Sequence, residues 1–444
     1  MSPRFLVLGG GPAGATTAAV LAQHGARVTL VERARMPRHH VGESLQPASI
    51  ALLERHLGLG AAIHAMGFPR KYGAAYVWGE TRTPWTVLFD PKLETDLPTL
   101  TEAALLAGPY EHAYNVERAP FDHLLLQEAA RRGAEVREEV EAVGILEEEG
   151  RVVGARLLAN GRHEEVRADF VVDASGQRCL VGRHFGLTRN VPDLQATATY
   201  TWFDGAGGFP GPLGRHVQWI ETVPDGWIWF IPIGPDRTSV GVVTRDRSRM
   251  DEARFDNILA SSGLPLAGAR AVPSGEGTGR LRFVRDWSFT HARLAGDGWM
   301  LVGDAAAFVD PILSGGVDFA IRGGCQAALA LLRAYGDEGA DRAELLAAYD
   351  ADVAKDYKAY LRLARYWYGN NRSVDGFFWE AHREIPPHAV STPYRAFVYL
   401  TTGQLAADRH LRVFQDWQER KMFRALGVDA EAVRRAARSA RGEG

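Results

Sequence analysis

The chain has 444 residues, enough for two or three domains or for one large α/β body with insertions. Hydrophobic residues make up 46% and charged residues 24%, as in ordinary globular enzymes, and a formal net charge of −3 gives no general case for nucleic-acid binding. Cys179 and Cys325 are the only cysteines, so we expect neither a disulfide nor a metal site. We also expect no targeting segment and no membrane span, and therefore a cytoplasmic protein.

The first 32 residues contain a dinucleotide-binding motif. An apolar strand at 4–9 runs into a glycine-rich turn, a helix follows to about His24, and a second strand ends at Glu32. Glycines in such a turn let the backbone approach a pyrophosphate, and the acid would bind ribose hydroxyls. On this motif alone the cofactor could be NAD or FAD. The cofactor-binding residues predicted here are Gly9, Gly11, Pro12, Ala13, Gly14, Glu32 and Arg33.

A second strand-to-helix junction lies near residue 300. A short apolar strand (299–302) ends in Gly303-Asp304, and a long helix begins near Gly315. The N-terminus of such a helix attracts anionic groups, including an electron-rich cofactor ring or a halide ion. One extended FAD could reach from Glu32 to Asp304, which favours FAD over NAD. Because no second glycine-rich fingerprint is present, reduced flavin would come from outside or NAD(P)H would bind transiently.

The segments between these junctions supply further candidates. Gly42-Glu43-Ser44 is a polar hinge, either a plain loop or a strap over the flavin, and Arg118 would contact a phosphate or the flavin. Four apolar stretches between residues 195 and 244 predict an antiparallel sheet. The strand at 226–233 is apolar on both faces, so Trp227 and Trp229 form either sheet core or an aromatic wall. Lys71 stands where an apolar strand begins, a place where most lysines are solvated.

These residues resemble a known family. GGGPAG at 9–14, DASG at 173–176 and VGDAA at 302–306 are similar to segments of single-component flavoprotein monooxygenases. Residues 227–232 (WIWFIP) match the W-x-W-x-I-P signature of FAD-dependent halogenases, and residues 308–316 match their F-x-x-P-x-x-S-x-G. Lys71 in FPRKYG falls where that family keeps a lysine, and HVGES at 40–44 resembles its flavin strap. The resemblance covers about residues 3 to 335.

The resemblance implies a halogenase that uses FADH2 from a separate flavin reductase, together with O2 and chloride or bromide. Hypohalous acid would form at the flavin and travel to Lys71, which would form a haloamine or hydrogen-bond the acid. The implied catalytic residues are Lys71, Trp227, Trp229 and Ser314, and the backbone of Gly315 and Gly316 would hold the halide. The implied flavin contacts are Glu43, Ser44, Arg118, Val140, Gly303, Asp304, Pro311, Gly316 and Val317.

The sequence departs from the family pattern at two positions. Leu313 stands where free-tryptophan halogenases carry a glutamate, which argues against tryptophan as the substrate. Gly315 stands where relatives usually carry Ser or Thr, so the loop is less stiff. We therefore expect a phenol, pyrrole or polyketide-derived substrate in secondary metabolism such as antibiotic biosynthesis, and it could be tethered to a carrier protein. Residues 351–444 carry a net charge of +5, from solvated helix faces or from a docking face for an acidic partner.

The predicted fold is an α/β, FAD-binding Rossmann-like domain of the GR2/monooxygenase type. It should carry an inserted antiparallel-sheet substrate domain and a helical C-terminal region. The expected boundaries are 1–65, 100–190 and 280–340 for the FAD-binding domain, 66–99 and 191–279 for the substrate domain, and 341–444 for the helical region. Two other functions fit part of the pattern, namely a flavin hydroxylase or geranylgeranyl-reductase-like oxidoreductase, and a non-catalytic flavin-binding protein.

Overall fold

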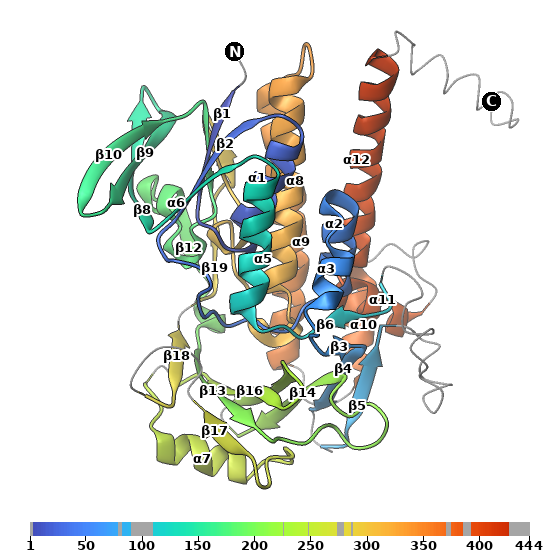
Figure 1. The fold of residues 1–444 in the computed structure, drawn as a ribbon. Coiled ribbons are helices and arrows are strands. Elements are labelled where there is room, and N and C mark those ends of the chain that lie inside the picture. The colour runs from blue at the N-terminus through green and yellow to red at the C-terminus, as the bar shows by residue number, and fades with distance from the viewer. Residues whose placement is uncertain are drawn as a thin grey trace, which may run out of the picture. The chain divides into compact units, whose positions relative to one another are not determined.

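A computed structural model describes residues 3–78, 82–89, 110–224, 226–246, 248–272, 279–285, 287–369, 374–384 and 392–425. The chain divides into two units, Met1–Gln404 and Leu405–Gly444, which are described separately. The predicted α/β class is confirmed, because the first unit combines a largely parallel sheet with helices and a second large sheet (Figure 1).

The dinucleotide-binding motif belongs to a six-stranded sheet with the order β20-β21-β11-β1-β2-β7. All neighbouring strands run parallel except β20, which is antiparallel to β21. The strand bounds are β1 Arg4–Leu8, β2 Arg27–Glu32, β7 Glu135–Glu138, β11 Phe170–Asp173, β20 Ala295–Gly296 and β21 Trp299–Leu301. The central strands are apolar on both faces because helices cover this sheet.

Three helices of this layer pack on one another, with α1 (Pro12–Gln23) against both α5 (Arg118–Arg131) and α8 (Gly316–Gly336) (Figure 1). Helix α1 begins with a proline in its first turn, where the missing N–H costs nothing. Its contact with α8 is close, because a Cβ on Gly324 would lie 2.7 Å from the carbonyl oxygen of Ala13. This glycine lets the two helices that carry the two predicted junctions lie side by side.

The second large sheet has eight strands in the order β17-β13-β16-β15-β14-β4-β5, with β18 also paired to β13. The bounds are β4 Gly73–Val77, β5 Trp85–Leu88, β13 Thr197–Asp204, β14 Val217–Val223, β15 Gly226–Pro232, β16 Arg237–Thr244, β17 Arg270–Val272 and β18 Arg282–Arg285. The four predicted stretches are β13, β14, β15 and β16, and they pair antiparallel as expected. The sheet also contains one parallel pair, because β14 runs parallel to β4. A long chain excursion separates these two strands, so no tight hairpin forces them to be antiparallel.

Smaller elements surround the two sheets. A three-stranded sheet contains β8 Val140–Glu148, β9 Arg151–Ala159 and β10 Arg162–Arg167. One two-stranded sheet pairs β3 Arg70–Lys71 with β6 Ala113–Tyr114. Another pairs β12 Thr188–Asn190 with β19 Phe289–His291. The short helices are α2 Pro47–Leu57, α3 Gly60–Ala65, α6 Leu180–His184 and α7 Glu252–Ala260, with 3-10 turns at Gly176–Arg178, Pro192–Leu194, Gly303–Ala305 and Pro311–Leu313. The neighbouring strands β18 and β19 join different sheets, because β18 pairs with β13 and β19 pairs with β12.

The last part of the first unit is helical, as predicted, with α9 Arg342–Gly369, α10 Val374–Glu384 and α11 Pro393–Thr401. Helix α12 (Gln404–Ala425) begins at the last residue of the first unit, and its remainder is the described part of the second unit. The helix expected beyond residue 425 lies outside the described residues. No helix in the described part of the chain has both the length and the apolar character needed to cross a membrane.

Candidate functional site

Residues that lie far apart in the sequence, from Leu8 to Ala320, line one cavity of about 790 Å³. The lining includes the glycine-rich turn, the segment 38–44, the start of α8 and the face of β15. The predicted site residues in this lining are Gly9, Gly11, Pro12, Ala13, Glu32, Arg33, Glu43, Ser44, Arg118, Val140, Trp227, Trp229, Asp304, Pro311, Ser314, Gly316 and Val317. The fold therefore brings most of the predicted residues into a single cavity.

Three predicted glycines and Lys71 are not part of this lining. A Cβ on Gly14 would lie 1.9 Å from the carbonyl oxygen of Gly9, and Gly303 has a φ of +59° with no room for a Cβ beside Ala13. Gly14 and Gly303 thus shape the two turns by close packing. The third glycine, Gly315, is the N-cap of α8.

The glycine-rich turn is tied to the acid at the end of β2. One carboxylate oxygen of Glu32 accepts a hydrogen bond from the backbone N–H of Gly10 over 2.7 Å, and the other accepts from Ala34 over 3.0 Å. The guanidinium of Arg38 lies 3.8 Å from Glu32 and 3.6 Å from Asp122. The acid holds the turn in shape and also lines the cavity.

The segment at residues 41–44, which we call the strap after its predicted role, lines the cavity. Arg118 donates to the carbonyl oxygens of Val41 and Gly42 over 2.8 and 3.1 Å. Asp122 holds the same guanidinium with two hydrogen bonds of 2.7 and 2.8 Å. The buried ion pair therefore fixes the strap, because a bidentate carboxylate orients the planar guanidinium.

Glu43 in this strap is a buried acid. It is 1% exposed, and burial raises its pKa to about 7. The indole N–H of Trp202 donates to one carboxylate oxygen over 2.9 Å. The side chain is thus half-protonated near neutrality, beside the cavity.

The second junction places a half-buried acid, Asp304, against the cavity. Burial raises the pKa of Asp304 to about 6, although the nearby Arg118 opposes the shift. Further along, Ser314 adopts a left-handed conformation with a φ of +54°, and its hydroxyl donates to Gln218 over 2.8 Å. A non-glycine residue in this region stores strain, which is common where a loop is shaped for binding.

Close packing explains why position 315 is a glycine. A Cβ there would lie 2.8 Å from Cε1 of Tyr360 and 3.2 Å from a ring carbon of Phe319. Its φ of −82° is open to any residue, so backbone strain is not the constraint. The departure from Ser or Thr makes room for the Tyr360 ring, whose hydroxyl contacts Gln46 over 3.2 Å and donates to the Leu400 carbonyl over 2.8 Å.

The tryptophans of β15 form an aromatic wall on one face of the strand. Trp227 and Trp229 both line the cavity, and their ring centroids lie 6.1 Å apart. Trp229 donates to the hydroxyl of Ser239 over 3.1 Å, and its ring fills the space that a side chain on Gly241 would occupy. On the opposite face Ile228 and Phe230 join the core of the sheet. The strand is buried on both faces, as its sequence predicted.

Lys71 is a buried lysine, 2% exposed, on the two-residue strand β3. Its Nζ donates to the carbonyl oxygen of Leu45 over 3.0 Å and lies 5.2 Å from the centroid of the Phe89 ring. Burial lowers its pKa from 10.5 to about 7. The side chain is therefore available as a neutral amine near neutral pH, unlike a solvated lysine.

Several residues of the site were missed by the sequence analysis. Two tyrosines of α9 bond backbone carbonyls in this region. The Tyr357 hydroxyl donates to the Gly303 carbonyl over 3.1 Å at the second junction, whereas the Tyr349 hydroxyl donates to the Leu301 carbonyl of β21 over 2.6 Å, outside the site. Arg38 and Gln218 line the cavity as well. Arg38 directly follows a proline in the first loop after the motif, which could have drawn attention to it. No local signal identified the tyrosines, because their contacts cross about 50 residues.

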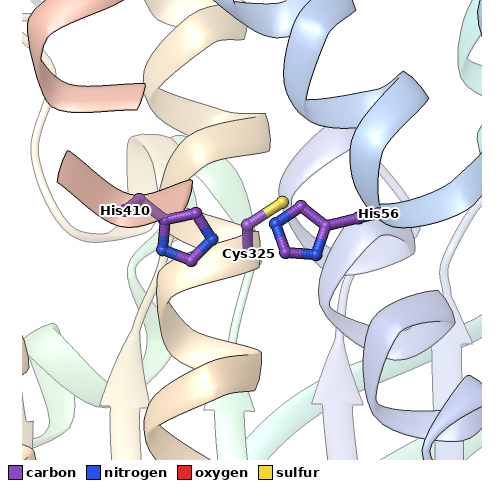
Figure 2. A group of neighbouring side chains, drawn as sticks. All are labelled: His56, Cys325 and His410. Carbon is purple, nitrogen blue, oxygen red and sulfur yellow. The ribbon is translucent and has the colours of Figure 1, made fainter. Parts of the chain in front are cut away.

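One pair of buried polar residues of the first unit lies outside the cavity lining, His56 on α2 and Cys325 on α8 (Figure 2). Their ring nitrogen and sulfur are within 4.8 Å of one another. Burial lowers the pKa of His56 to about 4 and raises the pKa of Cys325. Both groups are thus uncharged at neutral pH. Figure 2 also labels His410, which belongs to the second unit.

Comparisons with known proteins agree with this geometry. Residues 4–364 match the FAD-binding domain family. The chain is 32% identical over 397 residues to a tryptophan 2-halogenase of Chondromyces crocatus, covering 86% of this chain and 71% of that protein. It is 32% identical over 332 residues to a Pseudomonas fluorescens chlorinase of 1H-pyrrole-2-carbonyl on a peptidyl-carrier protein, covering 71% of this chain and 72% of that protein.

Solved structures give the same result. A myxobacterial chondrochloren halogenase superposes with a TM-score of 0.76 at 32% identity, over 91% of this chain and 90% of that one. The chain therefore belongs to the FAD-dependent halogenases, a family of flavoprotein oxidoreductases, and binds FAD.

Proposed function

We propose that this enzyme makes hypohalous acid in the cavity and delivers the halogen through Lys71 to an electron-rich aromatic substrate. The observation that carries the proposal is Lys71 itself, a buried lysine with a pKa lowered to about 7. Such an amine is a nucleophile at neutral pH, whereas a solvated lysine is nearly all protonated. Lys71 does not line the cavity that holds the predicted flavin residues, so the oxidising and transferring steps occupy different places.

The cavity residues suit FAD. The glycine-rich turn exposes backbone to a pyrophosphate, with Glu32 for the ribose and the strap at 41–44 along the ring system. When bound, reduced FAD supplies the two electrons of the overall step FADH2 + O2 + X⁻ + H⁺ → FAD + HOX + H2O. The N-terminus of α8 would hold the halide through the N–H groups of Gly315 and Gly316.

Transfer through Lys71 conserves atoms and charge. The amine attacks HOX and releases water to give a haloamine, R–NH2 + HOX → R–NHX + H2O. An aromatic carbon then takes the halogen and its proton returns to nitrogen, R–NHX + ArH → R–NH2 + ArX. Trp227 and Trp229 wall the cavity and keep the organic substrate away from the flavin residues. This separation favours halogenation over direct hydroxylation.

The substrate class follows from Leu313, which is 4% exposed and provides no carboxylate where the resemblance to tryptophan halogenases calls for one. Its backbone carbonyl accepts from Gln46 over 2.9 Å. A phenol or pyrrole activates its own ring and needs no such acid, so we infer one of these, or a polyketide-derived ring, as the acceptor. One relative acts on a pyrrole carried by a peptidyl-carrier protein, which supports a tethered acceptor here.

One experiment tests the reaction. Purified enzyme is supplied with a flavin reductase, NADH, O2, bromide and a phenolic acceptor. Excess methionine scavenges any hypobromous acid that escapes into solution, so that the phenol is brominated only on the enzyme. Lys71→Ala should abolish more than about 99% of the brominated product while flavin oxidation continues. Lys355→Ala, which removes an exposed lysine on α9, is the matched control. A hydroxylated product would indicate a hydroxylase, and bromination that survives Lys71→Ala would contradict the role of the lysine.

A competition experiment tests the acceptor. Free tryptophan, a free phenol, and pyrrole-2-carbonyl and hydroxybenzoyl groups loaded on a carrier protein are offered in equal amounts. We expect the loaded carriers to be halogenated fastest. Preferred halogenation of free tryptophan would contradict the inference drawn from Leu313.

A further inference from the structure

A hydroxyl from α9 joins the tryptophan wall to the loop before α8. The indole N–H of Trp227 donates to the hydroxyl oxygen of Tyr368 over 2.8 Å. That hydroxyl donates to the carboxylate of Asp310, whose two oxygens lie 3.1 and 3.0 Å away. Trp227 is 1% exposed and Asp310 is 6% exposed, so both ends of this chain of hydrogen bonds are buried.

The chemistry of the three groups allows only one arrangement when Asp310 is ionised. An indole N–H can only donate and a carboxylate can only accept, so a group that does both must stand between them. A phenolic hydroxyl meets this requirement. Bonds to a charged acceptor are also stronger than neutral ones, so the carboxylate fixes the hydroxyl, which in turn fixes the indole.

Asp310 also shapes the loop on the other side. Its Oδ1 accepts from the backbone N–H of Ile312 over 2.9 Å and so caps the 3-10 turn Pro311–Leu313. Ser314 follows directly in its left-handed conformation, and α8 begins at Gly316. Pro311, Ser314 and Gly316 line the cavity, whereas Asp310 and Tyr368 do not. The hydroxyl therefore connects two walls of the cavity from behind.

We propose that Tyr368 is a positioning residue that locks Trp227 to the loop Pro311–Gly316, so that hypohalous acid formed at the loop is guided along the tryptophan wall and does not escape as wasted oxidant. This inference rests on the proposed function, because it concerns the path of the oxidant. Tyr368 has no proposed contact with flavin, halide or substrate. Its side chain acts through Trp227 and Asp310. The exposed guanidinium of Arg245 lies 5.2 Å from the Tyr368 ring centroid and covers its outer face.

The substitution Tyr368→Phe removes one oxygen atom and keeps the ring. It leaves the Trp227 N–H and one acceptor of Asp310 without their partner, so the wall is free to shift against the loop. We expect the brominated product per reduced flavin consumed to fall about fivefold or more, with the missing oxidant recovered as peroxide or as hypobromous acid in solution. The rate of reduced-flavin oxidation and the affinity for FAD should change by less than about twofold.

The matched control is Tyr349→Phe, on the same helix. It also removes a buried hydroxyl, which donates to the Leu301 carbonyl over 2.6 Å. Any loss of general stability should affect both variants, as measured by the temperature of unfolding. Only Tyr368→Phe should lower the product yield per flavin.

A double-mutant cycle with Trp227→Phe identifies the route of the effect. Trp227→Phe removes the indole N–H and breaks the same bond from the other end. If the hydroxyl acts through Trp227, the double variant should lose little more than the worse single variant. If the fold-loss of product yield in the double variant equals the product of the two single fold-losses, the inference is overturned. If Tyr368→Phe fails to fold, the yield of Trp227→Phe decides, and an unchanged yield overturns the inference.

The outcomes separate this inference from the proposed function. A wild-type enzyme that brominates, with Tyr368→Phe indistinguishable from Tyr349→Phe, overturns the role of Tyr368 alone. A wild-type enzyme that makes no hypohalous acid overturns the proposed function and this inference together.

Discussion

The Nζ of Lys71 donates a hydrogen bond to the carbonyl oxygen of Leu45 over 3.0 Å, directly after the strap residue Ser44. The strap borders the cavity through Gly42, Glu43 and Ser44, whereas Lys71 stands behind it. The bond therefore links the proposed site of halogen transfer to the segment that borders the flavin site. A neutral amine and an ammonium can both make it, so the contact leaves the protonation state of Lys71 to be set by burial.

The first prediction concerns the pH dependence of halogen transfer. Burial lowers the pKa of Lys71 to about 7, and haloamine formation needs the neutral amine. With excess hypobromous acid, the Lys71-dependent rate of bromination, taken as the difference between the wild type and Lys71→Ala, should rise about tenfold per pH unit below 7 and level off above about 8. Single-turnover mixing at pH 5.5 to 9 measures it. A rate that falls as pH rises would show instead that the ammonium hydrogen-bonds the acid.

The second prediction concerns stability. The folded-state pKa of Lys71 lies below its unfolded value of 10.5, so the folded protein binds fewer protons between about pH 7 and 10.5. The cost of burying Lys71 is then complete below pH 7 and disappears as pH rises through 10.5. Lys71→Met should raise the free energy of unfolding by about 2–4 kcal/mol at pH 6 and by progressively less toward pH 10.

Urea unfolding at several pH values measures this difference. Lys355→Met replaces an exposed lysine and should show no comparable gain at pH 6. An equal gain in both variants would mean that methionine stabilises the chain by some general effect. A loss of stability in Lys71→Met would mean that the amine is held by favourable contacts.

The sequence was sufficient for the features that local patterns determine. The glycine-rich turn, the apolar strands and the start of α8 lie close to where their residues predicted, because strand burial and glycine conformation are decided by near neighbours. The alternating tryptophans predicted a strand buried on both faces, and the structure has Trp227 on the cavity side and Ile228 in the sheet core.

Contacts between distant segments could not be predicted in the same way. Tyr368 meets Trp227 across 141 positions, and Tyr360 meets Gln46 across 314. Nothing in the spacing of α9 indicated these partners, since a tyrosine in an amphipathic helix usually packs in the core. The parallel pairing of β4 with β14 was missed for the same reason. The reason for the glycine at position 315 could not be predicted either. The sequence shows that a side chain is missing there, but it does not show that the Tyr360 ring occupies the space.

The third prediction separates two glycines of the first turn. A Cβ on Gly11 would have only the Arg38 guanidinium nearby, at 3.6 Å, and would point into the cavity. A Cβ on Gly14 would overlap the carbonyl oxygen of Gly9 at 1.9 Å. Gly11→Ala should fold, with a stability cost of at most about 1 kcal/mol, but should bind FAD at least about 30-fold more weakly.

Gly14→Ala should instead destabilise the flavin-free protein by about 3 kcal/mol or more, since backbone must move. Thermal unfolding without flavin and fluorescence titration with FAD give the two measurements. The cofactor assignment fails if Gly11→Ala binds FAD as tightly as the wild type.

The last prediction concerns the loop in front of α8. Gly315→Ser introduces the residue type that the resemblance implies at this position, but its Cβ would lie 2.8 Å from the Tyr360 ring. Because that ring is buried and its hydroxyl is hydrogen-bonded to Leu400, it cannot move away freely. Gly315→Ser should therefore destabilise the protein by about 1–3 kcal/mol and raise the KM for bromide, because the N–H groups at the start of α8 shift.

A second substitution shows whether the ring is the cause. Tyr360→Leu removes the ring atoms that meet position 315, so the Gly315→Ser/Tyr360→Leu double variant should cost at least about 1 kcal/mol less than the sum of the single variants. Gly336→Ala is the control, because Gly336 has nothing within 4 Å of a Cβ and should lose no stability. If the losses of stability of the two single variants simply add in the double variant, the Tyr360 ring is not the reason for the glycine at position 315.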